Sequence, residues 1–187
     1  MHDARQQLFD AAERILLRDG PNALTSRAIT AEAGVAKGLV HRHFADFDAF
    51  LSELVLDRIT RLRTQTTALL DAAGTGTVSD NLTNALTEMF SPIAVAIVAL
   101  IIARDNLRTR LREAGTARIP LLGEGTAMIR AYLTAEQDMG RLDDNTDVRT
   151  LAPTLTGAVH LLCTEQETAP PDRAEVHKIV TTVIGTA

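Results

Sequence analysis

The stretch from Thr25 to Phe50 limits the possible folds of this chain more than any other part of it. Two segments of helix length lie on either side of Gly34-Val35-Ala36, and glycine supplies the backbone freedom that a tight turn needs. The second segment, Lys37 to Phe44, contains a lysine, an arginine and two histidines and no acidic residue. We therefore predict a helix-turn-helix in which Lys37 to Phe44 is the helix that enters DNA.

The composition favours an all-α fold. The chain has 187 residues, enough to bury a core in one domain or in two small ones. It is rich in helix-forming residues and has six prolines, one tyrosine and no tryptophan. The spacing of the apolar residues predicts about nine helices and no convincing strand.

The charge balance restricts the kind of DNA binding that is possible. The formal net charge of -5 argues against indiscriminate binding, because that interaction depends on a high density of cations. Residues 1–50 contain six Lys and Arg against seven Asp and Glu, so this part is nearly neutral. DNA contact must therefore be local, and the fold has to sort the cations onto one face.

The sequence points to a cytoplasmic protein. Cys163 is the only cysteine, which excludes an intramolecular disulfide, and we expect it to be an inert buried thiol. The N-terminus lacks the basic start and apolar run of a secretory signal. The longest apolar run, 93–103, is 11 residues, whereas a membrane-spanning helix needs about 20. We expect no membrane partner.

Helical periodicity predicts the elements in order along the chain. The first part should contain an amphipathic helix over 3–19, a helix capped by Thr25 or Ser26, the DNA-entering helix, and a long helix that Asp46 caps and that ends near Ala73. The later helices should cover 81–90, 93–103 buried nearly all round, a short exposed helix and loop in 104–118, then 119–139, 148–165 with a kink at Pro153, and 173–184.

A long helix is expected to join two domains. The segment from Asp71 to Asp80 is rich in turn-forming residues and marks where that helix ends. We assign residues 1–50 to a helix-turn-helix DNA-binding domain and residues 51–187 to a helical ligand-binding and dimerisation domain. The two C-terminal helices carry more aliphatic surface than one small subunit covers, so we expect a homodimer through them. Its two-fold symmetry would match a palindromic operator in double-stranded DNA.

The N-terminal quarter resembles the TetR family of bacterial one-component transcriptional regulators over residues 8 to 55. The matching residues are Thr25, Arg27, Ile29, Ala33-Gly34-Val35, Lys37-Gly38, His43-Phe44 and Phe50-Leu51. The resemblance implies a three-helix DNA-binding head, a long connecting helix, and a helical body that binds a small molecule and dimerises. It also implies repression that is relieved when ligand moves the two heads apart.

Four positions depart from the pattern of that family. Ala36 stands where serine is common, so a helix cap is missing; Leu39 replaces a common threonine, His41 a tyrosine that often meets a phosphate, and Phe47 a lysine. These changes remove at least one cation that would contact phosphate. We interpret them as altered specificity with weaker, more salt-sensitive affinity.

The candidate DNA contacts lie in both helices of the motif. They are Thr25, Ser26, Arg27, Lys37, Gly38, Leu39, His41, Arg42 and His43. Lys37 could be a solvated surface lysine instead, Thr25 could act only as a helix cap, and Leu39 could touch a thymine methyl or simply pack. His41 and His43, two positions apart, point to different sides of a helix and make a poor metal pair, so we predict no metal site.

The body should hold a small hydrophobic or amphipathic effector. Apolar walls with a few polar groups describe most ligand pockets, and five residues fit that description. They are Met89, Phe90, Met128, Tyr132 and His160, each of which could equally be ordinary core.

Two other classes of function remain to be weighed. An enzyme would need a catalytic constellation, and the sequence contains no phosphate loop, no paired metal-binding cysteines or histidines and no recognisable triad. We therefore predict no catalytic residue and no cofactor. The other class is a helical dimer that has lost specific DNA binding and acts through ligand or protein contacts, which the nearly neutral head and Phe47 keep open.

Overall fold

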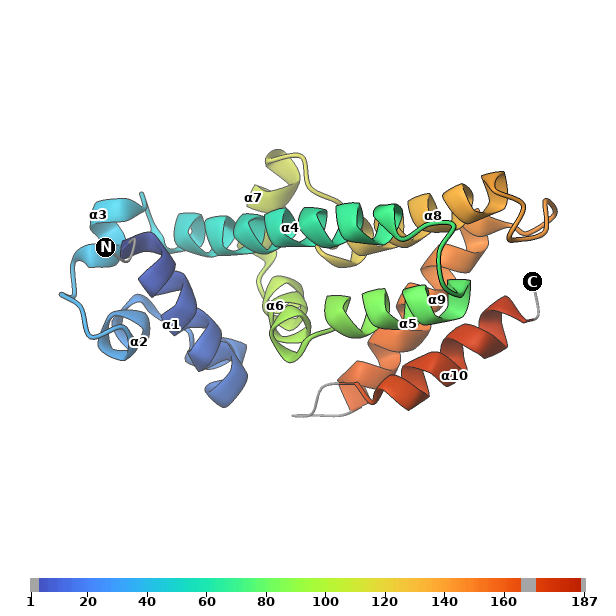
Figure 1. Cartoon of the computed structure of the whole chain (residues 1–187). Coiled ribbons are helices and arrows are strands. Elements are labelled where there is room, and N and C mark those ends of the chain that lie inside the picture. The colour runs from blue at the N-terminus through green and yellow to red at the C-terminus, as the bar shows by residue number, and fades with distance from the viewer. Residues whose placement is uncertain (1–3, 166–170, 186–187) are drawn as a thin grey trace. The chain divides into compact units, whose positions relative to one another are not determined.

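The computed structural model describes residues 4–165 and 171–185, and within these ranges all regular structure is helical (Figure 1). The described helices are α1 (Ala4–Asp19), the 3-10 turn η1 (Pro21–Ala23), α2 (Ser26–Glu32), α3 (Leu39–His43), α4 (Phe47–Asp71), α5 (Val78–Met89), α6 (Pro92–Ala103), α7 (Asp105–Glu113), α8 (Leu122–Asp138), α9 (Val148–Glu165) and α10 (Arg173–Ile184). The prediction of an all-α fold with an N-terminal helix-turn-helix and a helical C-terminal part is confirmed.

Contacts between residues divide the chain into two compact units. The first contains residues 1–58 and 96–120, and the second contains 59–95 and 121–187. The first unit thus includes α1 to α3 together with α7, an association that the sequence did not indicate. The assignment of residues 1–50 and 51–187 to separate domains stays a proposal, because a contact pattern does not measure which segments fold on their own.

The first unit is held by the predicted apolar stripe of α1 and an aromatic cluster. Leu8, Ala11, Ala12, Ile15 and Leu16 are all buried, with at most 3% of their surface exposed. The ring of Phe9 lies 5.9 Å from that of Phe44 and 5.5 Å from that of Phe50, and Phe44 and Phe50 meet edge to face at 5.0 Å. This cluster ties the end of α3 and the start of α4 to α1.

In the second unit, α8 packs against α9, and α10 packs against both α5 and α9. A buried polar network joins the segment between α4 and α5 to α8. The carboxylate of Glu136 is fully buried, accepts a hydrogen bond from the Gly74 backbone N–H at 3.3 Å, and forms an ion pair with Arg141 at 3.3 Å. Asn81 donates to the Tyr132 hydroxyl at 3.0 Å. Because buried polar groups are costly when unpaired, this network fixes the connection between α4 and α5.

Side-chain caps explain most of the differences from the predicted helix ends. α5 begins at Val78 rather than at Asn81, because the Thr77 hydroxyl accepts from the Asp80 N–H at 3.0 Å. α8 begins at Leu122 rather than at Ile119, where the Glu124 carboxylate accepts from the Leu121 N–H at 2.7 Å. Asp46 caps α4 as predicted, accepting from the Ala49 N–H at 2.6 Å.

The prediction that 93–103 is buried nearly all round was wrong. Its fully packed residues are Ile97, Val98, Leu100 and Ile101, whereas Ile102 is 49% exposed. Burial therefore covers one face of α6 rather than its whole circumference. Among the described residues, no single helix is both long and apolar enough to cross a membrane.

Candidate functional site

The first half of the motif forms as its sequence predicts. Thr25 has extended backbone angles, and its hydroxyl accepts a hydrogen bond from the Ala28 N–H at 3.1 Å, so it caps α2. At the other end of α2, Gly34 has a backbone φ of 66°, which residues other than glycine rarely adopt. The Val35 N–H then reaches back to the Thr30 carbonyl at 3.0 Å, which closes the turn.

The second helix of the motif is shorter than predicted. α3 covers Leu39–His43, so Lys37 and Gly38 lie in the turn before it rather than in its first turn. Gly38 is the N-cap and supplies no capping side chain. The expected lack of a cap is therefore present, but at Gly38 and not at Ala36. Because glycine is a poor helix former, α3 begins after Gly38, at Leu39.

Two apolar anchors hold α3 against the rest of the first unit. Val40 is fully buried and Phe44 is 3% exposed. Leu39 and His43 are half-buried, and the His43 ring lies 6.4 Å from the ring of Phe44. This packing leaves three side chains of the motif's second half exposed: Lys37, His41 and Arg42.

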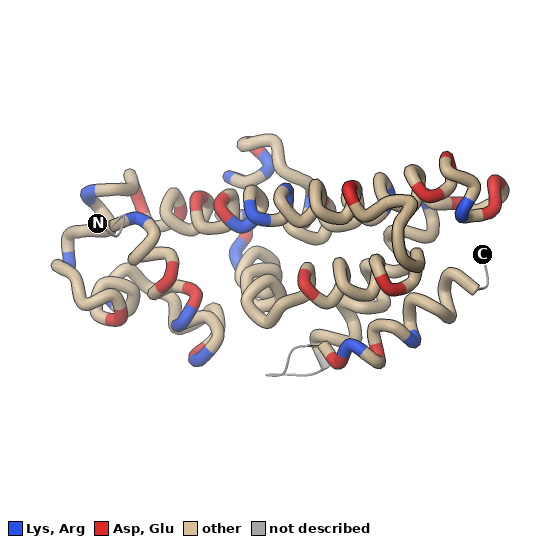
Figure 2. Tube along the Cα trace, viewed as in Figure 1, with Lys and Arg blue, Asp and Glu red and all other residues tan. Residues whose placement is uncertain are grey.

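The cations of residues 1–50 fall into two groups. Arg5, Arg14 and Arg18 form ion pairs with carboxylates. Arg27, Lys37 and Arg42 are exposed, and within residues 4–165 and 171–185 no ion pair or side-chain hydrogen bond engages their cationic groups. Figure 2 shows the charged positions along the trace. The three cations without a carboxylate partner are the three predicted to contact DNA.

Arginines of the first group pair with Glu32 of α2 and with Asp19 at the end of α1. Glu32 is the only acid between Thr25 and Phe44, and it accepts from Arg14 at 2.8 Å and from Arg18 at 3.0 Å. These hydrogen bonds lower the pKa of Glu32, and the hydrogen bond from Arg18 lowers that of Asp19. Both carboxylates thus stay ionised and paired with α1 arginines, so neither opposes phosphate through an unpaired charge.

The remaining predicted contacts differ in exposure. The Thr25 side chain is exposed although its hydroxyl is engaged in capping, and Ser26 is half-buried. Gly38 is exposed, with no heavy atom within 4 Å of the position that a Cβ would take. That open space permits another molecule to approach the backbone at Gly38 closely.

Four of the five predicted pocket residues lie in the core of the second unit, and His160 is half-buried. Met89, Phe90, Met128 and Tyr132 are each at most 6% exposed. Met89 packs directly against α8, since a Cβ added to Gly125 would stand 2.4 Å from its sulfur. The rings of Phe90 and His160 are 5.8 Å apart.

Burial perturbs the two titratable groups of this set. Burial, followed by the hydrogen bond with Glu136, raises the pKa of Tyr132, while burial alone lowers the pKa of His160. Both side chains are therefore neutral near pH 7 and can serve as uncharged hydrogen-bonding groups.

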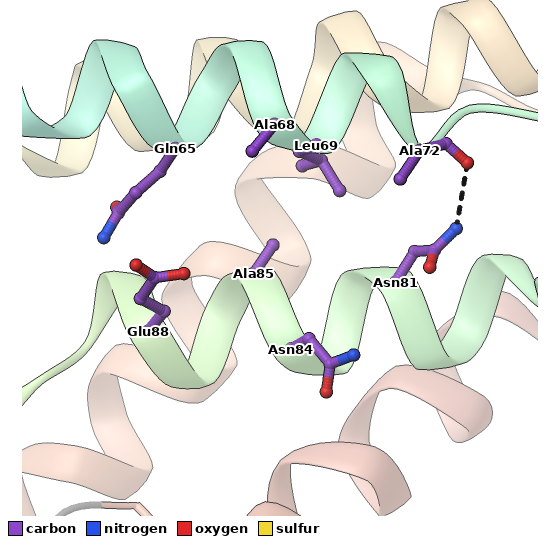
Figure 3. A pocket seen from close by; sticks show the side chains of 8 residues that line it. All are labelled: Gln65, Ala68, Leu69, Ala72, Asn81, Asn84, Ala85 and Glu88. Atoms are coloured by element: carbon purple, nitrogen blue, oxygen red, sulfur yellow. Dashed lines mark hydrogen bonds between the residues drawn. The ribbon is translucent and has the colours of Figure 1, made fainter.

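A groove of about 180 Å³ also lies in the second unit, between α4 and α5 (Figure 3). Ala68, Leu69 and Ala85 form its apolar part. At one end Gln65 and Glu88 point toward one another, as Figure 3 shows. None of the five predicted pocket residues lines this groove, so their role in binding a small molecule stays a prediction.

Two residues that contact the segments flanking the motif were not predicted from the sequence. It predicted that Asp46 caps α4, but not that Arg110 of α7 donates two hydrogen bonds to the same carboxylate. It also did not predict that Arg104 donates to the Leu24 carbonyl at 3.1 Å. These partners lie 64 and 80 positions apart in the sequence, beyond the reach of any local pattern.

Comparison with known proteins finds one family model and several solved structures that are similar to this chain. Residues 8–54 match the family model described as bacterial regulatory proteins, tetR family, whereas no curated protein sequence matches the chain. The fold is similar to that of FadR from Bacillus subtilis in complex with stearoyl-CoA, with 15% identity over 97% of this chain and 98% of that chain and a TM-score of 0.73.

Two further solved structures show the same similarity. FadR from Bacillus halodurans is 17% identical, with coverage of 99% of this chain and 97% of that chain and a TM-score of 0.76. A TetR family member from Streptomyces coelicolor A3 is 23% identical, with coverage of 97% and 99% and a TM-score of 0.67. At these identities the structures show a shared fold along the whole chain.

Proposed function

We propose, from the premise that this chain belongs to the tetR family of bacterial regulatory proteins, that it is a ligand-responsive transcriptional repressor. In this function two copies of the chain bind a palindromic operator through their helix-turn-helix motifs. A small molecule in the helical body then releases the protein from DNA.

One observation carries the DNA-binding part of this proposal. The turn and helix from Lys37 to His43, together with Arg27 of α2, present exposed cations that no carboxylate neutralises among the described residues. Arg42 and Lys37 are suited to base edges and phosphates in the major groove. Arg27 and the hydroxyls of Thr25 and Ser26 are suited to phosphates, which fix the register of the motif on the duplex. His41, Gly38 and Leu39 complete the proposed surface, and His43 supports it from beside Phe44.

The short α3 makes a paired arrangement important. A helix of five residues on which His41 and Arg42 are the exposed side chains offers few contacts from one subunit. When two such motifs belong to one rigid dimer, binding of the first to DNA makes binding of the second effectively intramolecular, which raises the overall affinity.

We propose that the dimer forms through α9 and α10. No charged residue occurs from Thr150 to Thr164 of α9, and Leu161 on that segment is 61% exposed, as expected for the centre of an interface.

The effector is proposed to be hydrophobic or amphipathic and to bind in the second unit among Met89, Phe90, Met128, Tyr132 and His160. The apolar side chains supply the walls, while Tyr132 and His160 supply uncharged polar groups. Met89 is a flexible side chain that can move away from Gly125 to admit a ligand. The similar FadR fold in complex with stearoyl-CoA is an example of an amphipathic ligand on such a scaffold.

The coupling between ligand and DNA follows from linkage. A ligand that prefers the conformation unable to bind the operator weakens DNA binding, and DNA weakens ligand binding by the same factor. The alternative, a helical dimer without specific DNA binding, is not favoured, because residues 8–54 retain the match to the regulatory family and the exposed cations.

The proposal is tested by selecting DNA with the purified protein from a pool of random duplexes of about 30 base pairs. We expect a two-fold symmetric consensus with half-sites about 10 base pairs apart, bound by two chains or a multiple of two. The logarithm of the binding constant for the selected duplex should fall linearly with the logarithm of salt concentration. No enriched sequence, or binding that is insensitive to salt, would overturn the proposal.

A further inference from the structure

Helix α7 and the residue before it contact the helix-turn-helix within the first unit. Leu107 and Leu111 of α7 are fully buried, and α7 belongs to the same compact unit as the motif. Two arginines of this segment, Arg104 as the N-cap of α7 and Arg110 within it, reach residues of the N-terminal part. We call residues 104–113 the α7 arm.

Arg110 holds the carboxylate of Asp46 with both of its terminal nitrogens. The distances are 2.8 Å from Nη1 to Oδ1 and 2.9 Å from Nη2 to Oδ2, the parallel geometry of a bidentate pair. Asp46 also caps α4 through the Ala49 N–H. These hydrogen bonds, first that from Arg110, lower the pKa of Asp46, which favours the charged form of its carboxylate. Bidentate geometry fixes direction as well as distance, which a single contact would not do.

Arg104 makes the second contact. Its Nη2 donates to the Leu24 carbonyl at 3.1 Å, and its guanidinium lies 5.6 Å from the centre of the Phe47 ring. Phe47 in turn stacks on Phe50 with ring centres 6.0 Å apart and an interplanar angle of 13°. The phenylalanine at position 47, where the family commonly has lysine, is thus a platform for a cation of the α7 arm.

The two contacts flank the motif in the sequence. Leu24 immediately precedes Thr25, the N-cap of α2, and Asp46 follows Phe44, the C-cap of α3, by two positions. The other arginines of the arm do not reach the motif: Arg108 bonds to Asp105 and the Ile102 carbonyl, and Arg112 donates to Thr109 at 3.2 Å. The arm therefore touches the motif at its entry and at its exit.

We propose that Arg104 and Arg110 are positioning residues for DNA recognition, which hold the two ends of the helix-turn-helix so that α3 has a fixed direction. This inference rests on the proposed function. The need for such support comes from α3 itself, which has only five residues and no side-chain cap at its start. A recognition element is effective only when the residues around it restrict its orientation.

The variant Asp46→Asn distinguishes positioning of the motif from a simple effect of charge, because the two predict opposite changes in DNA affinity. Asp46→Asn keeps a good helix cap for α4 but removes the charge that Arg110 binds. Loss of a negative charge beside the motif should strengthen DNA binding if charge alone matters. If Arg110 positions the motif through Asp46, binding should weaken instead, because the charged bidentate pair is lost.

The experiment measures affinity for the duplex that the wild-type protein selects, with four single variants and one double variant of the full chain. We expect Asp46→Asn and Arg110→Ala each to weaken binding about three- to tenfold, and the double variant to be no weaker than either, since both remove one interaction. Arg104→Met, which keeps an unbranched side chain over Phe47 but removes the donor, should weaken binding in the same range. Arg112→Ala is the matched control: it removes the same charge from the same helix and should leave affinity unchanged.

Three outcomes would overturn the inference while leaving the proposed function intact. They are tighter or equal binding by Asp46→Asn, effects of Asp46→Asn and Arg110→Ala that add in the double variant, and an equal loss in Arg112→Ala. Selection of no duplex by the wild-type protein would instead overturn the proposed function itself. Circular dichroism melting of each variant separates misfolding from misplacement, and the inference requires melting temperatures close to that of the wild type.

Discussion

The helix-turn-helix and the helical body differ in whether their charged groups are exposed without a partner or buried and paired. In the motif, Arg27, Lys37 and Arg42 are exposed, and none has a carboxylate partner in the described part of the chain. In the body, the Glu136 carboxylate is completely buried, accepts a hydrogen bond from the Gly74 backbone N–H and forms an ion pair with Arg141. Charges that are left available suit a partner outside the chain, whereas charges that are paired and buried hold the chain together.

The same two regions differ in how far their sequences can be matched. The family model covers residues 8–54, whereas similarity to solved structures extends over the whole chain at identities of 15 to 23%. A surface that contacts DNA needs particular donors at particular places, so residue identity matters there. A helical core needs only apolar residues of suitable volume at suitable spacing, which many sequences provide.

The largest expected effect concerns the available charges of the motif. Lys37→Ala combined with Arg42→Ala removes four cations from the proposed dimer and should weaken binding to the selected duplex at least about 1,000-fold, close to 4 kcal/mol. Gel-shift titration at fixed salt measures this change. Arg14→Ala combined with Arg18→Ala is the control, since it changes the net charge equally but removes cations that are already paired with Glu32 and Asp19. A similar loss in both double variants would break the distinction between available and paired charges.

The next effect concerns the paired charge of the body. Glu136→Ala leaves Arg141 without its carboxylate partner and the Gly74 N–H without an acceptor, and should destabilise the body by about 3 kcal/mol. Urea unfolding followed by circular dichroism measures the loss. Asp138→Ala, on the same helix but exposed, should change stability by less than about 0.5 kcal/mol. Equal midpoints for the two variants would mean that the buried network does not stabilise the body.

A smaller effect is expected at the cap of α2. Thr25→Val keeps the shape of the side chain but cannot accept from the Ala28 N–H, which should cost about 1 kcal/mol. Amide hydrogen exchange in α2 should then be about fivefold faster. Thr25→Ser retains the acceptor and should exchange at the wild-type rate. If Thr25→Val loses DNA affinity, Thr25→Ser keeps it and exchange is unchanged in both, the Thr25 hydroxyl acts on phosphate rather than as a cap.

The smallest effect is a pH dependence of the body. Burial lowers the pKa of His160, so the unfolded chain binds this proton more readily than the folded chain. The contribution of His160 therefore leaves stability unaffected at pH 8 and reduces it as the pH falls below about 6.5, the ordinary value for histidine. His160→Gln should show a smaller drop in urea midpoint between pH 8 and pH 5.5 than the wild type. An identical drop would show that His160 is not responsible.

Sequence periodicity predicted most helices because burial of an apolar stripe is a local pattern. The stripe of α1 and the caps at Thr25 and Asp46 were predicted correctly. The start of α3 was placed two residues early, since Lys37 and Gly38 read equally well as turn or helix until Val40 and Phe44 are seen packed. The roles of Met89, Phe90, Met128, Tyr132 and His160 stay predictions, because burial describes a core and a closed pocket equally well.

The sequence by itself determined an all-helical chain with a helix-turn-helix near its start, because spacing, glycine and capping residues act over a few positions. Only the tertiary structure decided which cations remain available and which are consumed. Arg14, Arg18 and Arg42 are equivalent in the sequence, yet two of them face Glu32 and one does not. It alone also brought Arg104 and Arg110 to the two ends of the motif. Pairing of charges depends on distance in space, which the order of residues does not record over 64 or 80 positions.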